Sequence, residues 1–370
     1  MWDVIVLGAG AAGLMAAIEA ARRGRRVLVL DHARAPGEKI RISGGGRCNF
    51  TNRTVAPERF LSANPRFALS ALRRFTPADF IARIDQAGIA WHEKTLGQLF
   101  CDGSARQVVD MLVRDLAAAG GTLRLGVTIG AVRPGFVVET GEGPLSTRAV
   151  IVATGGKSIP KMGATGFGYD IARCFGLPII EPRPGLVPLT FTDAERDGMR
   201  ALAGLSVAAR VGLAGARIAF DEGLLFTHRG LSGPSILQIS SYWREGQPIV
   251  VDLAAGRDLA AEAAAARGER GARDIANALD LPDALARAVV DRAGLSGKLA
   301  TQSKAALGRL GDAVHRWCLT PAGTEGWRTA EVTLGGVDTA ALDGRTMQAR
   351  AVPGLHFVGE VVDVTGWLGG

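Results

Sequence analysis

The glycines and the acid within the first 31 residues have the clearest chemical use in this 370-residue sequence. An apolar segment leads into a G-x-G-x-x-G motif at residues 8–13, a helix-forming segment follows, and a second apolar segment ends at Asp31. In this context Gly8 permits a tight turn, Gly10 lets a pyrophosphate approach the backbone, and Gly13 lets the helix pack closely on the strand. The pattern predicts a β–α–β unit that binds a dinucleotide.

Electrostatics supports this prediction for two parts of the ligand. The N-terminus of the helix offers unpaired N–H groups and the positive end of its dipole to phosphates. Asp31 can accept hydrogen bonds from both hydroxyls of a ribose. Its charge would repel a 2′-phosphate, which disfavours NADP at this position.

Two later segments indicate which dinucleotide is bound. Residues 148–156, RAVIVATGG, form an apolar strand that meets two glycines, and residues 354–366, GLHFVGEVVDVTG, form a second strand followed by Gly359, Glu360 and Asp363. In flavoproteins of the glutathione-reductase type, the first of these strands passes under the cofactor. The acid after the glycine of the late strand meets the ribityl chain or the pyrophosphate. Both segments in this order favour FAD over NAD.

A loop rich in glycine, arginine and asparagine is expected over residues 32–54, and ISGGGRCNFTN at 42–52 is its most distinctive part. Its three consecutive glycines permit backbone conformations that other residues avoid. The segment resembles the Gly-Gly-x-Cys-x-Asn element of flavin disulfide reductases, which carry a second cysteine where this chain has Arg53. That difference excludes a redox-active disulfide and favours Cys48 as a small residue beside the flavin rather than a nucleophile.

Longer motifs spread over the whole chain resemble the HI0933/BaiN-like family of NAD(P)/FAD-dependent oxidoreductases. They are the N-terminal motif, SGGGRCNFTN (43–52), ATGGKSIPKMGATGFGYDIA (153–172), LLFTHRGLSGPSILQIS (224–240), TLGGVDT (333–339) and GLHFVGEVVDVTGWLGG (354–370). The motifs and the resemblance together predict a set of cofactor-binding residues, with FAD as the cofactor. These residues are Gly8, Gly10, Ala12, Gly13, Asp31, Ser43, Gly44, Gly45, Gly46, Arg47, Cys48, Asn49, Val127, Ala153, Thr154, Gly155, Gly156, Gly359, Glu360, Asp363, Gly366, Gly369 and Gly370.

The resemblance implies an α/β fold, in which a Rossmann-like FAD-binding domain of the glutathione-reductase type is interrupted by a β-barrel-like insert with a helical subdomain. The sequence changes accordingly, since residues 189–253 alternate short apolar runs with glycines and residues 257–317 are rich in alanine. We expect a discontinuous FAD-binding domain at 1–189 plus 329–370, a β-rich insert at 190–256 and a helical subdomain at 257–328.

The C-terminal end departs from the family pattern. Members of the family continue past the last two glycines into a helix whose N-terminus points at the flavin, whereas this sequence ends at Gly370. We expect either that the sequence is truncated or that flavin binding is weakened.

For activity, the resemblance implies reduction of an activated C=C bond, either of uridine in ribosomal RNA to dihydrouridine or of an enone-type small molecule. The alternatives are a non-catalytic flavin-dependent RNA-binding or scaffold protein, and an FAD oxidase or dehydrogenase of a small metabolite. The family also implies NAD(P)H as a transient electron donor. The sequence has no second complete dinucleotide motif, and the glycine-rich residues 163–168 could hold NAD(P)H or, as we favour, flank the flavin.

A proton donor is expected in the segment FTHRGLSGP, where His228 and Arg229 are the candidate catalytic residues. An imidazole suits proton transfer near neutral pH. The alternative is that Thr227 and His228 only cap backbone groups at a domain junction. Lys157 and Lys161 are alternative cations near the flavin or a bound anion.

The amino-acid composition limits the classes of partner that we expect. A net charge of +7, from 43 basic and 36 acidic residues, could hold RNA through its phosphates, but a codon bias toward arginine and alanine explains it equally well. Only 2 tyrosines offer little stacking surface for bases. We expect a small-molecule or RNA substrate, no DNA, and no membrane partner, because no apolar run approaches the roughly 18 residues of a membrane span.

Two further sequence features indicate the cellular compartment and the metal content. The N-terminus lacks the features of a signal peptide, so we expect a cytoplasmic protein. The four cysteines show no C-x-x-C spacing, which predicts no metal site. The oligomeric state stays open.

Overall fold

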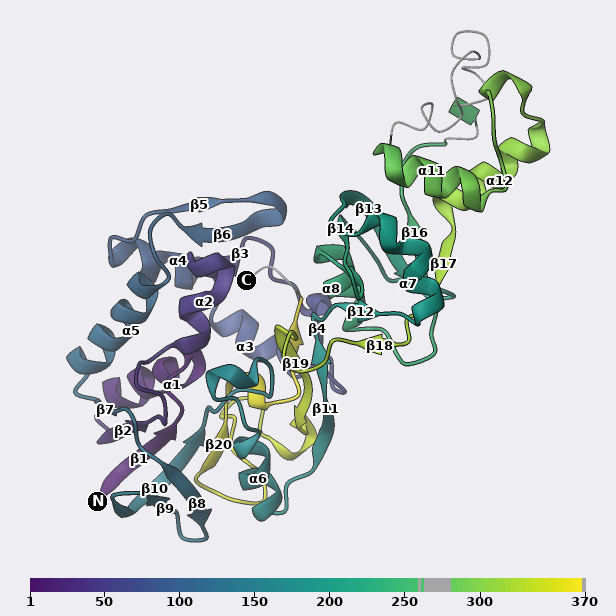
Figure 1. Cartoon of the computed structure of the whole chain (residues 1–370). Helices are drawn as coiled ribbons and strands as arrows, with labels where there is room; N and C mark the ends of the chain where they lie inside the picture. The colour runs from purple at the N-terminus through teal and green to yellow at the C-terminus, as the bar shows by residue number, and fades with distance from the viewer. Residues whose placement is uncertain (259–260, 263–280, 368–370) are drawn as a thin grey trace. The chain divides into compact units, whose positions relative to one another are not determined.

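The computed structural model describes residues 1–258, 261–262 and 281–367, and the chain separates into two compact units (Figure 1). Unit 1 comprises Met1–Pro184 and Glu331–Gly370, and unit 2 comprises Gly185–Ala330. The three segments expected from the sequence, at 1–189 plus 329–370, 190–256 and 257–328, remain a prediction of which parts of the chain form separate domains.

Unit 1 is built on a seven-stranded sheet with the order β7-β2-β1-β10-β9-β8, in which β20 also pairs with β10. Strands β7, β2, β1, β10 and β20 run parallel, whereas β9 and β8 are antiparallel additions. The bounds are β1 (Trp2–Leu7), β2 (Val27–Leu30), β7 (Thr122–Arg124), β8 (Ile129–Arg133), β9 (Val137–Thr140), β10 (Gly143–Val152) and β20 (Leu355–Phe357).

Helices and short sheets complete unit 1. The helices are α1 (Ala11–Arg22), α2 (Glu38–Gly46), α3 (Leu69–Arg74), α4 (Pro77–Gln86), α5 (Arg106–Ala118) and α6 (Phe167–Cys174). The short sheets pair β3 (Asn49–Asn52) with β6 (Gln98–Cys101) and β5 (Trp91–Glu93), β4 (Phe60–Leu61) with β21 (Thr365–Gly366), and β11 (Ile179–Gly185) with β19 (Val332–Val337).

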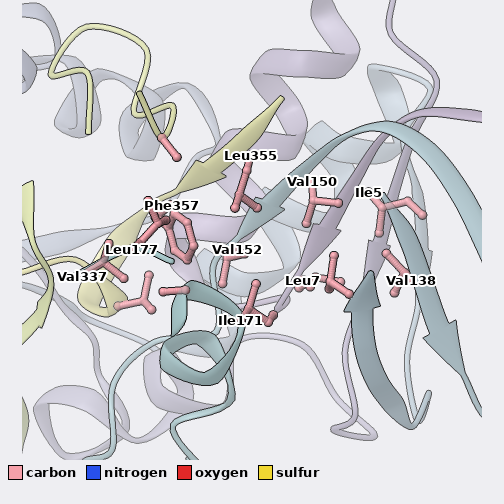
Figure 2. Packing of buried hydrophobic residues seen from close by; sticks show 14 of the residues in the cluster. Ile5, Leu7, Val138, Val150, Val152, Ile171, Leu177, Val337, Leu355 and Phe357 are labelled. Atoms are coloured by element: carbon pink, nitrogen blue, oxygen red, sulfur yellow. The ribbon is translucent and has the colours of Figure 1, made fainter. Parts of the chain in front are cut away.

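Both faces of the parallel sheet are buried, as parallel strands require. Successive side chains of a strand point to opposite faces, so Ile5 and Leu7 of β1 lie in one core cluster and Val6 lies in the other. Figure 2 shows the first cluster, to which β1 contributes Ile5 and Leu7, the adjacent β10 contributes Val150 and Val152, and β20 beyond it contributes Leu355 and Phe357. The second cluster contains side chains of α1 and α5.

Unit 2 carries a second seven-stranded sheet, with the order β17-β16-β13-β14-β15-β12-β18 and antiparallel pairs throughout. Its strands are β12 (Leu189–Thr190), β13 (Ser206–Leu213), β14 (Ala219–Phe226), β15 (Gly230–Ser232), β16 (Ile249–Asp252), β17 (Trp317–Leu319) and β18 (Gly323–Thr324). Its helices include α7 (Asp193–Met199), α8 (Pro234–Ser240), α11 (Asp283–Arg292) and α12 (Lys304–His315).

Two local expectations differ from the structure. The loop expected over residues 32–54 contains α2, because the helix-forming residues from Glu38 start a helix that ends where Gly44 and Gly45 adopt positive φ. Residues 317–324, which we placed in the helical subdomain, contain β17 and β18 at the edges of the sheet. Whether such a short edge strand forms depends on its pairing with strands that are distant in sequence, and this pairing cannot be predicted from the local sequence.

Over the residues that the structure describes, we find no helix with the length and apolar character required to cross a bilayer.

Candidate cofactor site

A cavity of about 310 Å³ lies at the carboxyl edge of the parallel sheet of unit 1. The strands end in register there, with Leu7 opposite Val152 and Val152 opposite Phe357, so the loops after β1, β10 and β20 meet. Ligands of open α/β sheets bind at this edge. The lining consists of Gly8, Gly10, Ala11, Ala12, Asp31, His32, Ala33, Gly37, Glu38, Lys39, Ile40, Ala153, Thr154, Gly155, Gly156, Met162, Gly163, Ala164, Gly359 and Glu360.

The three motif glycines have different reasons to be glycine. A Cβ on Gly8 would lie 2.4 Å from the carbonyl oxygen of Ala153, and a Cβ on Gly13 would lie 1.9 Å from the carbonyl oxygen of Gly8. These two are therefore required by the packing of the chain on itself. A Cβ on Gly10 would meet no protein atom within 4 Å, yet Gly10 lines the cavity. The protein leaves this space open, as close approach of a pyrophosphate requires.

Asp31 is held at the end of β2 by two backbone donors. Its Oδ2 accepts a hydrogen bond from the N–H of Ala9 at 2.6 Å, and its Oδ1 accepts one from the N–H of Ala33 at 2.8 Å. Each carboxylate oxygen has a second lone pair. The carboxylate is thus oriented into the cavity lining with acceptor capacity left for ribose hydroxyls.

A polar network around Glu360 and Lys39 fixes another part of the cavity lining. Glu360 accepts hydrogen bonds at Oε1 from the N–H of Thr333, at 2.6 Å, and from Ser158 Oγ, at 3.3 Å. Lys39 Nζ donates to Glu360 Oε2 at 2.9 Å and to Ser158 Oγ at 2.7 Å. This network joins α2, the loop after β10 and the segment after β20, so the acid predicted to meet the cofactor is rigidly placed.

One buried polar atom of the lining has no partner. Thr154 Oγ1 is buried and finds no hydrogen-bond partner among the described residues. Buried hydroxyls are nearly always hydrogen-bonded, so Thr154 is an exception among the described residues, and its hydroxyl lies against Gly168 of α6. The open space beside Gly10 and the oriented Asp31 together fit the phosphate and ribose parts of FAD.

Sequence reasoning missed part of this lining. Lys39 and His32 line the cavity, and His32 Nδ1 lies 3.4 Å from Asp31 Oδ1. Neither was among the predicted cofactor residues, and both fell in the loop expected over residues 32–54. Ser158 and Thr333 were also missed, because only the fold brings them to Glu360. Of the glycine-rich residues 163–168, Gly163 and Ala164 lie in the lining, next to Met162, and their role beside the flavin stays a prediction.

Several predicted cofactor residues lie outside this lining. Val127 donates its N–H to the carbonyl oxygen of Asp31, at 3.0 Å, and belongs to the core. Asp363 is buried and accepts a hydrogen bond from the N–H of Ala63 at 2.7 Å, and burial raises the pKa of its carboxyl group. Gly366 pairs with Phe60 between β21 and β4. Gly369 and Gly370 lie outside the described residues.

The segment Ser43–Asn49 turns sharply rather than facing this cavity. Gly44, Gly45 and Gly46 all have positive φ, and a Cβ on Gly44 would lie 2.7 Å from the Phe100 ring. Cys48 is buried, and that burial raises the pKa of its thiol. A neutral buried thiol is a poor nucleophile, which agrees with the sequence interpretation of Cys48. Contact of Ser43, Arg47 and Asn49 with the flavin stays a prediction.

His228 and Arg229 lie in unit 2, and both are exposed. Thr227 Oγ1 accepts hydrogen bonds from the N–H groups of Arg229, at 3.2 Å, and Gly230, at 3.1 Å, so Thr227 caps this turn. His228 lines a separate hollow of about 280 Å³ with Arg196, Asp197, Arg200, Ala203 and Thr227. A catalytic role for His228 and Arg229 stays a prediction. Lys157 Nζ lies 6.0 Å from the centre of the Tyr169 ring in unit 1.

Comparison with known proteins places the chain. The family described as the HI0933-like protein Rossmann domain matches residues 2–370. The chain belongs to this family. It is an FAD-dependent oxidoreductase whose Rossmann-like domain supplies the cavity described above.

Individual relatives extend along the full chain. The sequence is 46% identical over 377 residues to the "Ribosomal RNA dihydrouridine synthase" of Escherichia coli (strain K12), covering 100% of this chain and 94% of the relative. It is 27% identical to the "3-dehydro-bile acid delta(4,6)-reductase" of Clostridium scindens (strain ATCC 35704 / DSM 5676 / VPI 13733 / 19), covering 99% of this chain and 94% of the relative.

A solved structure shares the fold. The 3-ketosteroid-delta4-(5alpha)-dehydrogenase from Rhodococcus jostii RHA1, in complex with 4-androstene-3,17-dione, superposes with a TM-score of 0.52 at 15% sequence identity. The match covers 100% of this chain and 92% of that chain. At this identity the likeness concerns the fold alone.

Proposed function

We propose that this HI0933-like protein reduces uridine in ribosomal RNA to dihydrouridine, with NAD(P)H as the electron donor. The observation that carries the proposal is the 46% identity to a relative named ribosomal RNA dihydrouridine synthase, because it extends over 100% of this chain. The cavity of unit 1 supports the proposal, because its lining fits the cofactor that such a reduction requires.

The overall reaction balances with one hydride and one proton. When bound, FAD would supply the redox chemistry of hydride transfer between a nicotinamide and the uracil ring. The hydride adds to C6, the carbon β to the C4 carbonyl, and a proton adds to C5. The C5=C6 bond is lost, and NAD(P)⁺ and dihydrouridine are the products.

Residues of the chain have three tasks in this proposal. The open backbone at Gly10 and the N-terminus of α1 bind the pyrophosphate, and Asp31 binds a ribose. Glu360 and Lys39 hold the polar side of the site. His228 is our candidate for the proton donor to C5, with Arg229 as an orienting cation.

A second candidate substrate is an enone-type small molecule. The relative named 3-dehydro-bile acid delta(4,6)-reductase, at 27% identity, favours it, and the same chemistry applies, since hydride adds to the carbon β to a carbonyl. The lower identity makes it the second candidate.

The deciding experiment measures dihydrouridine in purified ribosomal RNA, by nucleoside mass spectrometry, in a deletion strain and its parent. We expect loss of the nucleoside in the deletion strain and its return when the gene is supplied in trans. A complementing gene with Gly10→Val serves as control, since it retains the fold and lowers flavin binding. Unchanged dihydrouridine in the deletion strain would exclude the RNA substrate and leave the enone reaction.

A further inference from the structure

Unit 1 carries a second hollow that the cofactor site does not use. It has a volume of about 540 Å³ and is lined by Arg74, Asp343, Arg345, Thr346, Gln348 and Arg350, which we call the arginine hollow. Its lining contains three guanidinium groups and a single carboxylate. Arg74, Arg345 and Arg350 are all exposed.

The fold builds this hollow from two distant segments. Arg74 ends α3, and its Nη1 and Nη2 both donate to the carbonyl oxygen of Arg345 at 3.2 Å. Asp343 shapes the turn that follows it, because its Oδ1 accepts hydrogen bonds from the N–H groups of Arg345, at 3.0 Å, and Thr346, at 2.9 Å. The same oxygen accepts a third bond from Thr346 Oγ1 at 3.0 Å. Oδ1 is therefore occupied by its own turn, while the carboxylate as a whole still attracts Arg350.

The positive charge of the hollow is only partly offset, by the attraction between Asp343 and Arg350. Within the described part of the chain, no carboxylate forms an ion pair with Arg74, Arg345 or Arg350. The hollow of unit 2 differs, because Arg196 and Arg200 there pair with Asp193 and Asp197. Three cations around one concave surface suit an anion with several oxygens.

The hollow lies toward the same sheet edge as the cofactor cavity. The segment after the turn runs antiparallel to β20, since Gln348 bridges His356 and the N–H of Phe357 donates to Met347. The Arg345 end of the segment therefore lies toward the carboxyl end of β20. The chain enters the cavity at Gly359, directly beyond that end.

We propose that the arginine hollow binds the phosphodiester backbone of the ribosomal RNA substrate, at a place outside the reacting uridine. The inference rests on the proposed function, since it names the surface that holds the RNA while the uridine reacts elsewhere. Arginine contacts to phosphates position a nucleic acid without reading its sequence. The hollow should therefore contribute to affinity and not to the choice of base.

The test compares two charge-matched double variants of the FAD-loaded protein. Arg345→Gln with Arg350→Gln removes two charges from the hollow. Arg106→Gln with Arg114→Gln removes two charges from exposed positions on α5, where the structure gives neither arginine an ion pair among the described residues. Each protein is titrated with ribosomal RNA from the deletion strain at several salt concentrations, with inorganic phosphate as a competitor in a parallel series.

We expect the hollow variant to bind the RNA roughly tenfold to hundredfold more weakly than wild type, with a salt slope smaller by about 1 to 2. The α5 variant should stay within about threefold of wild type. Reduction of the flavin by NAD(P)H should be equal in all three proteins, which shows that the cofactor site is intact.

Other results overturn the inference. Equal RNA affinity and slope in both double variants would do so, as would absence of RNA binding by the wild type. Competition by millimolar phosphate that abolishes the difference between the variants would identify a small-anion site instead. The deletion strain tests the proposed function separately. Loss of dihydrouridine there, together with normal RNA binding by the hollow variant, would support the proposed function and contradict the inference about the hollow.

Discussion

At the scale of single residues, the two glycines Gly10 and Gly13 separate ligand binding from folding. A Cβ on Gly10 meets no protein atom within 4 Å, and its φ of −78° suits any residue. Gly10→Ala should leave the free energy of unfolding of the FAD-free protein within about 0.5 kcal/mol of wild type. It should weaken FAD binding roughly tenfold or more, measured by quenching of flavin fluorescence, because the methyl group enters the space left for the pyrophosphate.

Gly13→Ala is the matched control with the opposite outcome. Its Cβ would lie 1.9 Å from a backbone carbonyl oxygen, which cannot move away as a flexible side chain could. We expect a loss of about 1–3 kcal/mol in the free energy of unfolding of the FAD-free protein. Equal effects of the two substitutions on stability and on FAD binding would contradict the assignment of the cavity.

His228 gives a residue-scale test of the proton donor. His228→Gln should slow dihydrouridine formation by roughly 10²–10⁴-fold, the usual contribution of a general acid. Reduction of the flavin by NAD(P)H should be unchanged, because that step needs no proton from this residue. His92→Gln, at a partly exposed histidine paired with Asp102, is the control and should leave dihydrouridine formation unchanged. If His228→Gln changes only the midpoint of unfolding, His228 has a structural role in the turn that Thr227 caps, and it is not the proton donor.

The buried thiols make a prediction about pH. Burial, with smaller effects of Cys48 and Asp102, raises the pKa of Cys101 from 9.0 to about 11. In the native protein at neutral pH, iodoacetamide should label the exposed Cys174 and Cys318 and spare Cys101, as peptide mass spectrometry would show. The unfolded thiol ionises first, so the free energy of unfolding should fall as the pH rises from about 9 toward about 11. Cys101→Ala should flatten that part of the pH profile.

At the scale of elements, the sequence predicts what periodicity and local motifs encode. The β–α–β unit of β1, α1 and β2, and the strands β10 and β20, follow from apolar runs that end in glycine. The helix α2 was missed because its last three residues are glycines. The network of Lys39 and Glu360 was missed for another reason: its partners are 321 residues apart, and only tertiary folding brings them together.

The strand β20 links the core to the cofactor site and carries a prediction of its own. Phe357 is fully buried against Val152, and the chain turns into the cavity at Gly359. Phe357→Ala should lower the free energy of unfolding by about 3–5 kcal/mol. FAD binding, measured well below the unfolding midpoint, should weaken as well, because the cavity left in the core frees the segment that holds Glu360.

Two control substitutions isolate this effect. Phe357→Leu should cost less than about 1.5 kcal/mol and keep FAD affinity, since most of the volume is retained. Phe226→Ala, at a fully buried position in unit 2, should destabilise the protein to a similar extent without changing FAD affinity. If Phe226→Ala weakens FAD binding equally, global stability and not β20 governs the site.

At the scale of the whole molecule, the net charge of +7 has two possible explanations. The positions of the charged side chains in the structure help to choose between them. Composition alone allowed either RNA binding or a codon bias. The structure adds that many arginines pair with nearby acids, such as Arg23 with Glu19 and Arg173 with Asp170, whereas those of the arginine hollow do not. Sequence could not give this distinction, because the ion pairs and the hollow depend on which side chains the fold brings together.

This placement predicts how activity depends on salt. Binding of a polyanion releases counterions, so the apparent Kd for ribosomal RNA should rise at least about tenfold between roughly 50 and 200 mM salt. Reduction of the flavin by NAD(P)H without RNA involves no such release and should change little over that range. Both are measured on one preparation, by dihydrouridine formation at varied RNA concentration and by loss of flavin absorbance. A small uncharged enone tested in the same way should show no salt dependence. Turnover of RNA that is equally insensitive to salt would argue that the basic residues do not hold the substrate. The net charge would then be explained by the codon bias toward arginine and alanine.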